Sequence, residues 1–156
     1  MKTHDYEVKV EWTGNKGSGT FDYRSYSRNH IITGKDKGIS IPASSDPTFM
    51  GDPSKYNPEE LFLSSLSACH MLWFLHLCAI NNIIVLEYSD VPSGTMEERG
   101  DGSGFFKEVI LNPEVVVSSK EMISKANELH EKANQMCFIA NSCNFDIRHE
   151  AKTMVK

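Results

Sequence analysis

The sequence lacks any run of lysine or arginine. Its 16 basic residues stand against 21 acidic ones, and the formal net charge is -5. A chain that binds nucleic acid normally carries a basic patch or stripe, so we expect no nucleic-acid partner. Residues 1–7 contain no apolar run of the signal-peptide type, which favours a cytoplasmic location.

Motifs for nucleotides and metals are also missing. Gly14, Gly17 and Gly19 superficially resemble a phosphate loop, but they lead into an expected strand and no Gly-Lys-Ser/Thr follows. No residues show the C-x-x-C or H-x-x-x-H spacing of common metal sites. The minor alternative is a metal site drawn from five scattered residues, namely His70, His76, Cys78, His130 and Cys137.

Only one stretch is apolar over a long distance. Residues 61–80 carry no formal charge and reach the length of a membrane-spanning helix. Polar side chains interrupt this stretch and charged sequence surrounds it, which favours a helix buried in a soluble core. The interrupting residues are Ser64, Ser65, Ser67, His70 and His76. A chain of 156 residues is expected to form one domain, residues 1–156.

The hydrophobic pattern predicts two helices among several strands. Asn57 as a cap, with a proline and two carboxylates in the first turn, predicts a helix over about 58–79. A second helix is expected over about 120–138, capped by Ser118 or Ser119. Strands are expected over 5–12, 20–32 (as one or two strands), 83–98, 104–118 and 144–150, with a loop over 39–56. This order predicts an α+β fold with a mostly antiparallel sheet.

Cys69 lies in the middle of the first expected helix, and Cys137 lies near the end of the second. In a reducing compartment, Cys69 and Cys137 are more suited to catalysis or metal binding than to a permanent bridge. A thiolate is the attacking species, and an apolar setting disfavours it. Cys69 lies too deep in its helix for the helix N-terminus to help, so a cation must come from elsewhere. The candidates are Arg24 and Arg28, which are four residues apart and would share one face of an extended strand.

The position of Glu59 adds a constraint on this site. Glu59 could orient an arginine by a bidentate pair. Ten residues separate Glu59 from Cys69, so the two lie about 15 Å apart along one helix. They can share a site only between two copies of the chain, and the spacing therefore favours a homodimer with its sites at the interface.

The second cysteine shares a helical stripe with two other residues. Cys137 follows His130 by seven residues and Ala133 by four, and this stripe is expected beside the apolar one. A thiol there could meet an oxidised Cys69 and form a disulfide. Cys78 and Cys143 match no motif and are expected to be core or incidental thiols.

Three short segments carry a family resemblance. Residues 57–61 (NPEEL), 67–69 (SAC) and 137–142 (CFIANS) resemble the OsmC/Ohr family of hydroperoxide-reducing proteins, over nearly the whole chain. The resemblance implies an intertwined homodimer in which Cys69 is peroxidatic and Cys137 is resolving. It also implies an arginine–glutamate pair that includes Glu59, a lipoyl or other dithiol as reductant, and no metal or organic cofactor.

The chain departs from the family pattern at three places. Family members often carry the arginine in the glycine turn, where this chain has Lys16, so Arg24 is the first candidate and Arg28 the second. His70 follows Cys69 where many members have phenylalanine, and the common proline after Cys137 is absent. The expected function is a thiol peroxidase of a divergent subgroup, acting on organic hydroperoxides. The alternative is a non-catalytic stress or small-ligand-binding protein of the same fold.

Overall fold

Helix α1 (Pro58–Ile80) begins with the cap that the sequence predicts. The Asn57 backbone N–H donates to Glu60 Oε2 at 3.1 Å, and the Glu60 N–H donates to Asn57 Oδ1 at 2.8 Å. This reciprocal capping box satisfies two N–H groups that the helix itself leaves free. Asn82, in the left-handed conformation with φ 57, follows the helix end. The prediction of a helix over 58–79 is confirmed.

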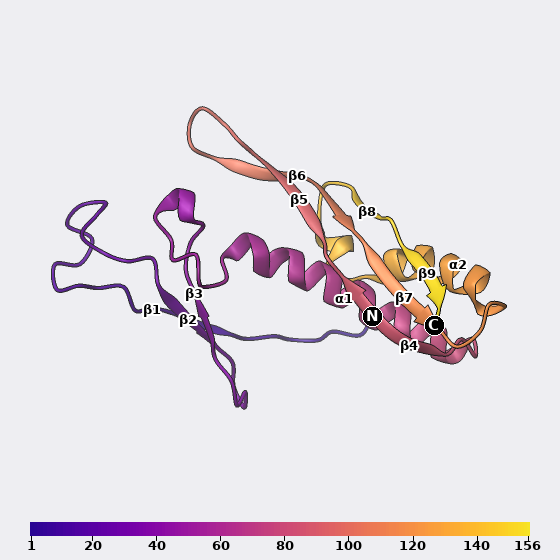
Figure 1. The fold of residues 1–156 in the computed structure, drawn as a ribbon. Coiled ribbons are helices and arrows are strands. Elements are labelled where there is room, and N and C mark those ends of the chain that lie inside the picture. The colour runs from indigo at the N-terminus through magenta and orange to yellow at the C-terminus, as the bar shows by residue number, and fades with distance from the viewer. The chain divides into compact units, whose positions relative to one another are not determined.

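The structure is a computed structural model that describes residues 1–156, in two compact units of residues 1–61 and 62–156 (Figure 1). The first unit contains one antiparallel sheet in the order β1-β2-β3 and a short 3-10 helix, η1. Their bounds are Lys9–Trp12 for β1, His30–Thr33 for β2, Ile41–Ala43 for β3 and Pro47–Phe49 for η1. Strand β3 and η1 lie where the sequence predicts only a loop.

The prediction of strands over residues 20–32 is wrong for most of that range. Only β2 is extended, and residues 17–26 form turns. Local side chains take the backbone N–H groups that a strand would need: Asn15 Oδ1 accepts from two glycine N–H groups, and Asp22 Oδ1 accepts from the Arg24 N–H at 2.7 Å. Such short-range bonds compete with a strand ladder. Arg24 and Arg28 therefore do not share one face of a strand.

The second unit combines α1 with two three-stranded sheets, in the orders β4-β7-β9 and β5-β6-β8. Figure 1 shows the β5–β6 hairpin as the long arm of this unit. The strands are β4 (Val85–Asp90), β5 (Ser93–Glu98), β6 (Gly104–Leu111), β7 (Pro113–Val117), β8 (Ile147–His149) and β9 (Lys152–Val155). The α+β fold is confirmed. Its sheets are not wholly antiparallel, because β8 and β9 pair in parallel with β6 and β7.

Helix α2 (Met122–Met136) packs against the first of these sheets and against α1. It begins after Glu121, which makes no side-chain capping bond, so the predicted serine cap is wrong. The core joins the two helices to β7 through nine buried residues: Phe74, Leu77, Cys78, Ile83, Val115, Val117, Ala126, Leu129 and Ala133. His130 is also buried, at 1% exposure. Its predicted place beside the apolar stripe is wrong, since it lies within it.

Helix α1 is buried on one side only within a single chain. Its most apolar 18-residue window is 28% buried, and by length and composition alone the helix could also cross a membrane. The core helix of a soluble protein meets the same criterion. The exposed side follows a spacing of four residues, through Ser64, Ala68, Leu72, His76 and Ile80. An apolar stripe of this kind needs a cover that one chain does not supply.

A candidate site at the contact of the two helices

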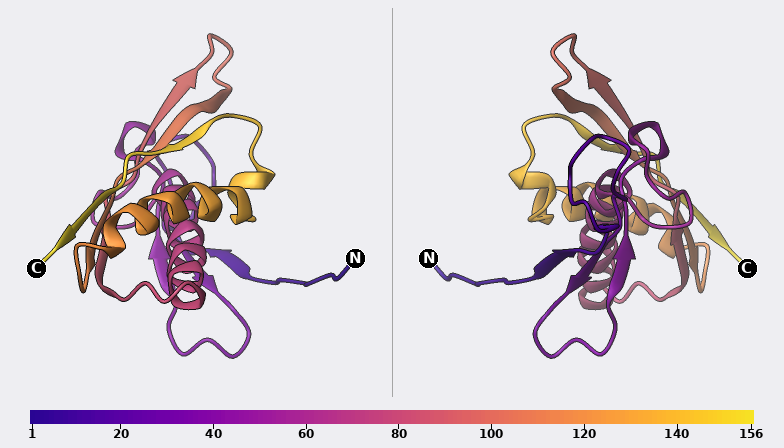
Figure 2. Two further views of the ribbon diagram at one scale, coloured as in Figure 1. Left: turned by 90° about the vertical axis from the view of Figure 1, so that its right-hand side faces the viewer. Right: turned by 90° about the vertical axis from the view of Figure 1, so that its left-hand side faces the viewer.

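Helix α2 crosses α1 (Figure 2). The thiols of Cys69 on α1 and of Cys137 at the end of α2 are close enough to interact. Cys69 lies in the middle of α1 and is half-buried, whereas Cys137 caps the C-terminus of α2 and is 1% exposed. Each thiol influences the other, and both are free rather than joined in a disulfide. A disulfide between them requires the two Cα atoms to lie about 4.4–6.8 Å apart.

Cys137 is held as a protonated thiol. Burial raises its pKa to about 12, and the hydrogen bond with the Cys69 thiol acts in the same direction. The Ala140 N–H donates to Cys137 Sγ at 3.4 Å from the 3-10 helix η2 (Ala140–Ser142) and acts weakly against that rise. A thiol of this kind is a poor first nucleophile. It is suited to react second, once its neighbour has been oxidised.

A small, open and mostly apolar hollow lies on α1 in the turns that follow Cys69. Leu72, Trp73 and His76 line a space of about 300 Å³. These residues follow Cys69 by three, four and seven positions, so they share its helix face. Phe138, the residue after Cys137, contacts Trp73 edge-on with ring centroids 5.7 Å apart. The cysteine pair therefore borders an aromatic surface that could hold an apolar substrate.

Sequence reasoning missed a buried pair of imidazoles in the same helix contact. His70 Nε2 lies 3.0 Å from His130 Nδ1, and the rings are nearly parallel. Burial lowers the pKa of His70 to about 4, and that of His130 to about 3. His149 adds a third ring, with centroids 5.5 and 6.0 Å from the other two. The available signal was that His70 follows Cys69 while His130 shares a stripe with Cys137.

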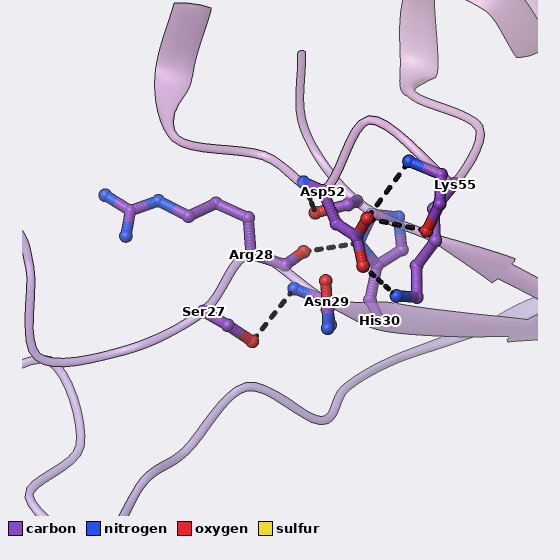
Figure 3. Close-up of polar contacts among 8 residues, drawn as sticks. Ser27, Arg28, Asn29, His30, Asp52 and Lys55 are labelled. Atoms are coloured by element: carbon purple, nitrogen blue, oxygen red, sulfur yellow. Dashed lines mark hydrogen bonds and ion pairs between the residues drawn. The ribbon is translucent and has the colours of Figure 1, made fainter. Parts of the chain in front are cut away.

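The two candidate arginines lie in the first unit, in the loop between β1 and β2. Arg28 is fully engaged there: its guanidinium donates to the carbonyls of Tyr23 and Tyr26 at 2.7 and 2.8 Å. It also lies 4.3 and 4.2 Å from the centroids of those two tyrosine rings. Figure 3 shows this side chain pointing away from the Asp52–Lys55 ion pair. The Arg28 side chain therefore stabilises its own loop.

Arg24 and Glu59 are differently placed. The Arg24 side chain is exposed, and only its backbone N–H is tied, to Asp22. Glu59 is half-buried in the first turn of α1 and makes neither a hydrogen bond nor an ion pair. The first unit thus holds Arg24, Arg28 and Glu59, and the second holds Cys69 and Cys137. Both Arg24 and Glu59 have charged groups free to meet another group.

The remaining cysteines and histidines do not assemble a metal site. No group of three or more His, Cys, Asp or Glu side chains is arranged to hold a metal ion. Cys78 is a core residue at 1% exposure, and burial raises its pKa to about 11. Cys143 is half-buried, and its thiol donates to the Ile139 carbonyl at 3.3 Å.

Comparisons with other proteins identify a family and several structures of the same fold. A family model described as OsmC-like protein matches residues 51–152. A solved OsmC-like protein of unknown function from Vibrio cholerae is 33% identical, with a TM-score of 0.84 over 96% of this chain and 100% of that one. A search of curated proteins finds no match.

Two more distant structures share the fold. An organic hydroperoxide resistance protein from Elizabethkingia anophelis, solved with bound thiocyanate, is 21% identical with a TM-score of 0.69, and both chains are covered completely. An organic hydroperoxide resistance protein OsmC from Legionella pneumophila is 15% identical, with a TM-score of 0.71 over 99% of this chain and 100% of that one.

Proposed function

This chain belongs to the OsmC-like protein family, and from that premise we propose that it is a thiol peroxidase that reduces organic hydroperoxides. The observation that carries the proposal is the contact of the Cys69 and Cys137 thiols across α1 and α2. Two relatives of the same fold are named organic hydroperoxide resistance proteins, which supports this class of substrate.

The chemistry follows from the different settings of the two thiols. The Cys69 thiolate attacks the O–O bond of the hydroperoxide, which becomes an alcohol as it takes up a proton, and leaves a sulfenic acid on Cys69. The Cys137 sulfur then displaces water from that sulfenic acid, because the thiol proton of Cys137 leaves with the hydroxyl group. A dithiol reduces the resulting Cys69–Cys137 disulfide in two exchange steps and is itself oxidised to a disulfide.

The activating charges come from the first unit of a partner copy. Arg24 is the better arginine, because the Arg28 guanidinium is already held by two carbonyls and two tyrosine rings. Glu59 orients Arg24 by a bidentate pair. Since Glu59 and Cys69 lie about 15 Å apart on one helix, the glutamate that serves each cysteine belongs to the other chain.

A homodimer is supported by the apolar surface that one chain leaves open. Leu72 and Ile80 on α1 are each 63% exposed. In the first unit, the β1-β2-β3 sheet and its neighbours expose Val8, Val10, Trp12, Ile31, Ile39 and Ile41. Exposed apolar residues gathered on one surface often mark a contact with another protein chain. A second copy that covers them also brings the two units of different chains into one site.

The mass of the protein after one equivalent of cumene hydroperoxide tests the proposal. The wild-type chain should lose two hydrogens, and the loss should disappear in both Cys69→Ser and Cys137→Ser. Cys143→Ser is the matched control and should still lose them. An unchanged wild-type mass would rule out the peroxidase. Turnover with cumene hydroperoxide and with hydrogen peroxide, measured side by side, tests the preference for organic substrates.

A binding role is the second candidate, and one observation favours it. The cavity lined by Leu72, Trp73 and His76 is apolar and open, and so suits a small apolar ligand without any chemistry at sulfur. In that case the wild-type mass stays unchanged with peroxide. Cumyl alcohol, which has the apolar group but no O–O bond, would still bind and would lose affinity in Trp73→Ala.

A further inference from the structure

A hydrogen bond between two buried imidazoles ties α1 to α2. His70 and His130 are 0% and 1% exposed, and Nε2 of the first lies 3.0 Å from Nδ1 of the second. The two ring planes differ by 5°, and the His130 ring also stacks on Phe74 with centroids 3.9 Å apart. The pair is therefore held on a packed aromatic layer.

Both rings of this pair are uncharged at neutral pH. Burial lowers the pKa of both side chains, so at neutral pH one ring donates its N–H and the other accepts it. The outer nitrogens, His70 Nδ1 and His130 Nε2, are buried and have no hydrogen-bond partner. Whichever ring donates, one unpaired donor and one unpaired acceptor remain.

Such a pair is a poor means of stabilising a core. Two buried polar atoms without partners cost folding free energy, and apolar side chains of similar shape in both positions are often neutral or stabilising. What a buried hydrogen bond does provide is a fixed geometry between the elements that it joins. The function of this pair should therefore be sought in what it positions.

The pair lies in the same helix contact as the cysteines. His70 directly follows Cys69 on α1, and His130 precedes Cys137 by seven residues, or about two turns of α2. A rotation or slide of α2 on α1 that breaks the imidazole bond therefore also separates the two thiols. Trp73 and Phe138 contact each other on the side of the cysteines, so the helices touch at both ends of this segment.

We propose that His70 and His130 are positioning residues, whose hydrogen bond fixes α1 against α2 in the register that keeps the Cys69 and Cys137 thiols in contact. This inference rests on the proposed peroxidase, because the second step of that reaction joins the Cys69 and Cys137 sulfurs. The other titratable groups around the pair are His149 from β8, close to both rings, and Glu131 from α2, whose Oε2 lies 3.9 Å from His149 Nε2.

The equilibrium between the cysteine pair and glutathione tests this register directly, without hydroperoxide. Oxidised glutathione takes two hydrogens from the Cys69 and Cys137 thiols and becomes two reduced glutathiones, and peptide mapping after alkylation measures the bridge formed. In His70→Leu/His130→Leu the equilibrium constant for the bridge should fall about fivefold, the effect of one net buried hydrogen bond. Urea unfolding should show that this variant is no less stable than the wild type.

A conservative variant distinguishes position from packing. His70→Gln/His130→Asn keeps an amide donor near Nε2 and an oxygen near Nδ1, so it should restore the wild-type constant. His4→Gln, which changes an exposed histidine, is the control. If the leucine pair fails to fold, His70→Met/His130→Met replaces it, because methionine fits irregular space.

Two results overturn the proposal: a leucine or methionine variant with the wild-type constant, or a wild-type chain that forms no Cys69–Cys137 bridge with glutathione. A failure of the peroxidase gives a different pattern. In that case glutathione still forms the bridge with the predicted dependence on His70 and His130, while hydroperoxide does not.

Discussion

The indole of Trp73 meets the ring of Phe138 edge-on across the contact of α1 and α2, with planes 84° apart. Trp73 lies one turn after Cys69, and Phe138 directly follows Cys137. The ring pair therefore moves with the cysteine pair. Any reaction that pulls the two sulfurs to bonding distance must also change the surroundings of this indole.

Oxidation should change the fluorescence of Trp73. The chain has two tryptophans, so Trp12→Phe leaves Trp73 as the only reporter. One equivalent of cumene hydroperoxide should shift its emission, and a dithiol should reverse the shift. In Trp73→Phe, which keeps only Trp12, the emission should stay constant. A constant emission in Trp12→Phe after the bridge has formed, as verified by mass, would show that the helix contact does not move.

Removal of Arg24 should change the reactivity of Cys69, whereas removal of Arg28 should change the free energy of unfolding. Arg24→Ala should slow the alkylation of Cys69 by iodoacetamide at pH 7 about tenfold, because the thiolate is the attacking species and a nearby positive charge stabilises it. Its stability should be unchanged, since the Arg24 side chain is exposed and makes no bond in the chain. Equal alkylation rates in Arg24→Ala and the wild type would remove this arginine from the site.

Arg28→Ala should lower the stability of the chain and leave the alkylation of Cys69 unchanged. It removes two hydrogen bonds to carbonyls and two contacts with tyrosine rings, a loss of about 2 kcal/mol in the free energy of unfolding. Urea unfolding measures that loss. Alkylation of Cys69 under native conditions should stay near the wild-type rate, and a tenfold decrease with unchanged stability would exchange the roles of the two arginines.

The His70–His130 pair predicts a loss of stability in acid. Above the ordinary histidine pKa of 6.5, both rings are neutral in the folded and the unfolded chain. Below that value the unfolded chain binds protons, while the folded chain does not until pH reaches about 4 for His70 and about 3 for His130. The free energy of unfolding therefore falls as pH falls through this window.

The size of this acid effect can be measured. At roughly 1.4 kcal/mol for each pH unit, His70 alone should cost about 3 kcal/mol by pH 4. Urea unfolding at pH 7, 6, 5 and 4 gives the slope. His70→Leu/His130→Leu should have a flatter profile, whereas His149→Gln tests whether the partly exposed third ring carries the effect. A wild-type profile as flat as that of the leucine pair would show that the imidazoles are not held neutral.

The sequence predicts the parts of this molecule that depend on near neighbours. Helix α1 was predictable because Asn57 and Glu60, which form its cap, are three residues apart and its apolar run is continuous. The motifs around Cys69 and Cys137 single out these two residues from the sequence alone, and their roles stay a prediction. The turns over residues 20–26 were missed although their cause is also local, because side chains such as Asp22 compete with the backbone in a way that periodicity does not reveal.

Contacts between distant residues account for most of the remaining errors. His70 and His130 are 60 positions apart. A helix turns about 100° per residue, so a small rotation decides whether His130 faces the core or its border, and packing sets that rotation. Strand β9 was not predicted because its four residues are held by parallel pairing with β7, far away in the chain. Neither the His70–His130 contact nor the pairing of β9 with β7 produces a residue pattern within one segment of the sequence.

A charge on the exposed face of α1 should dissociate the proposed homodimer. Leu72 is 63% exposed in one chain and lies on the stripe that a second copy would cover. Burying one leucine contributes about 1.5–3 kcal/mol, and two-fold symmetry buries it twice. Leu72→Glu should therefore weaken the dimer by about 100-fold or more and leave a monomer at micromolar concentration. Val91→Glu, at a residue 80% exposed and off the helix, should remain dimeric. Sedimentation velocity distinguishes these states, and a wild-type chain that sediments as a monomer would contradict both the dimer and the shared site.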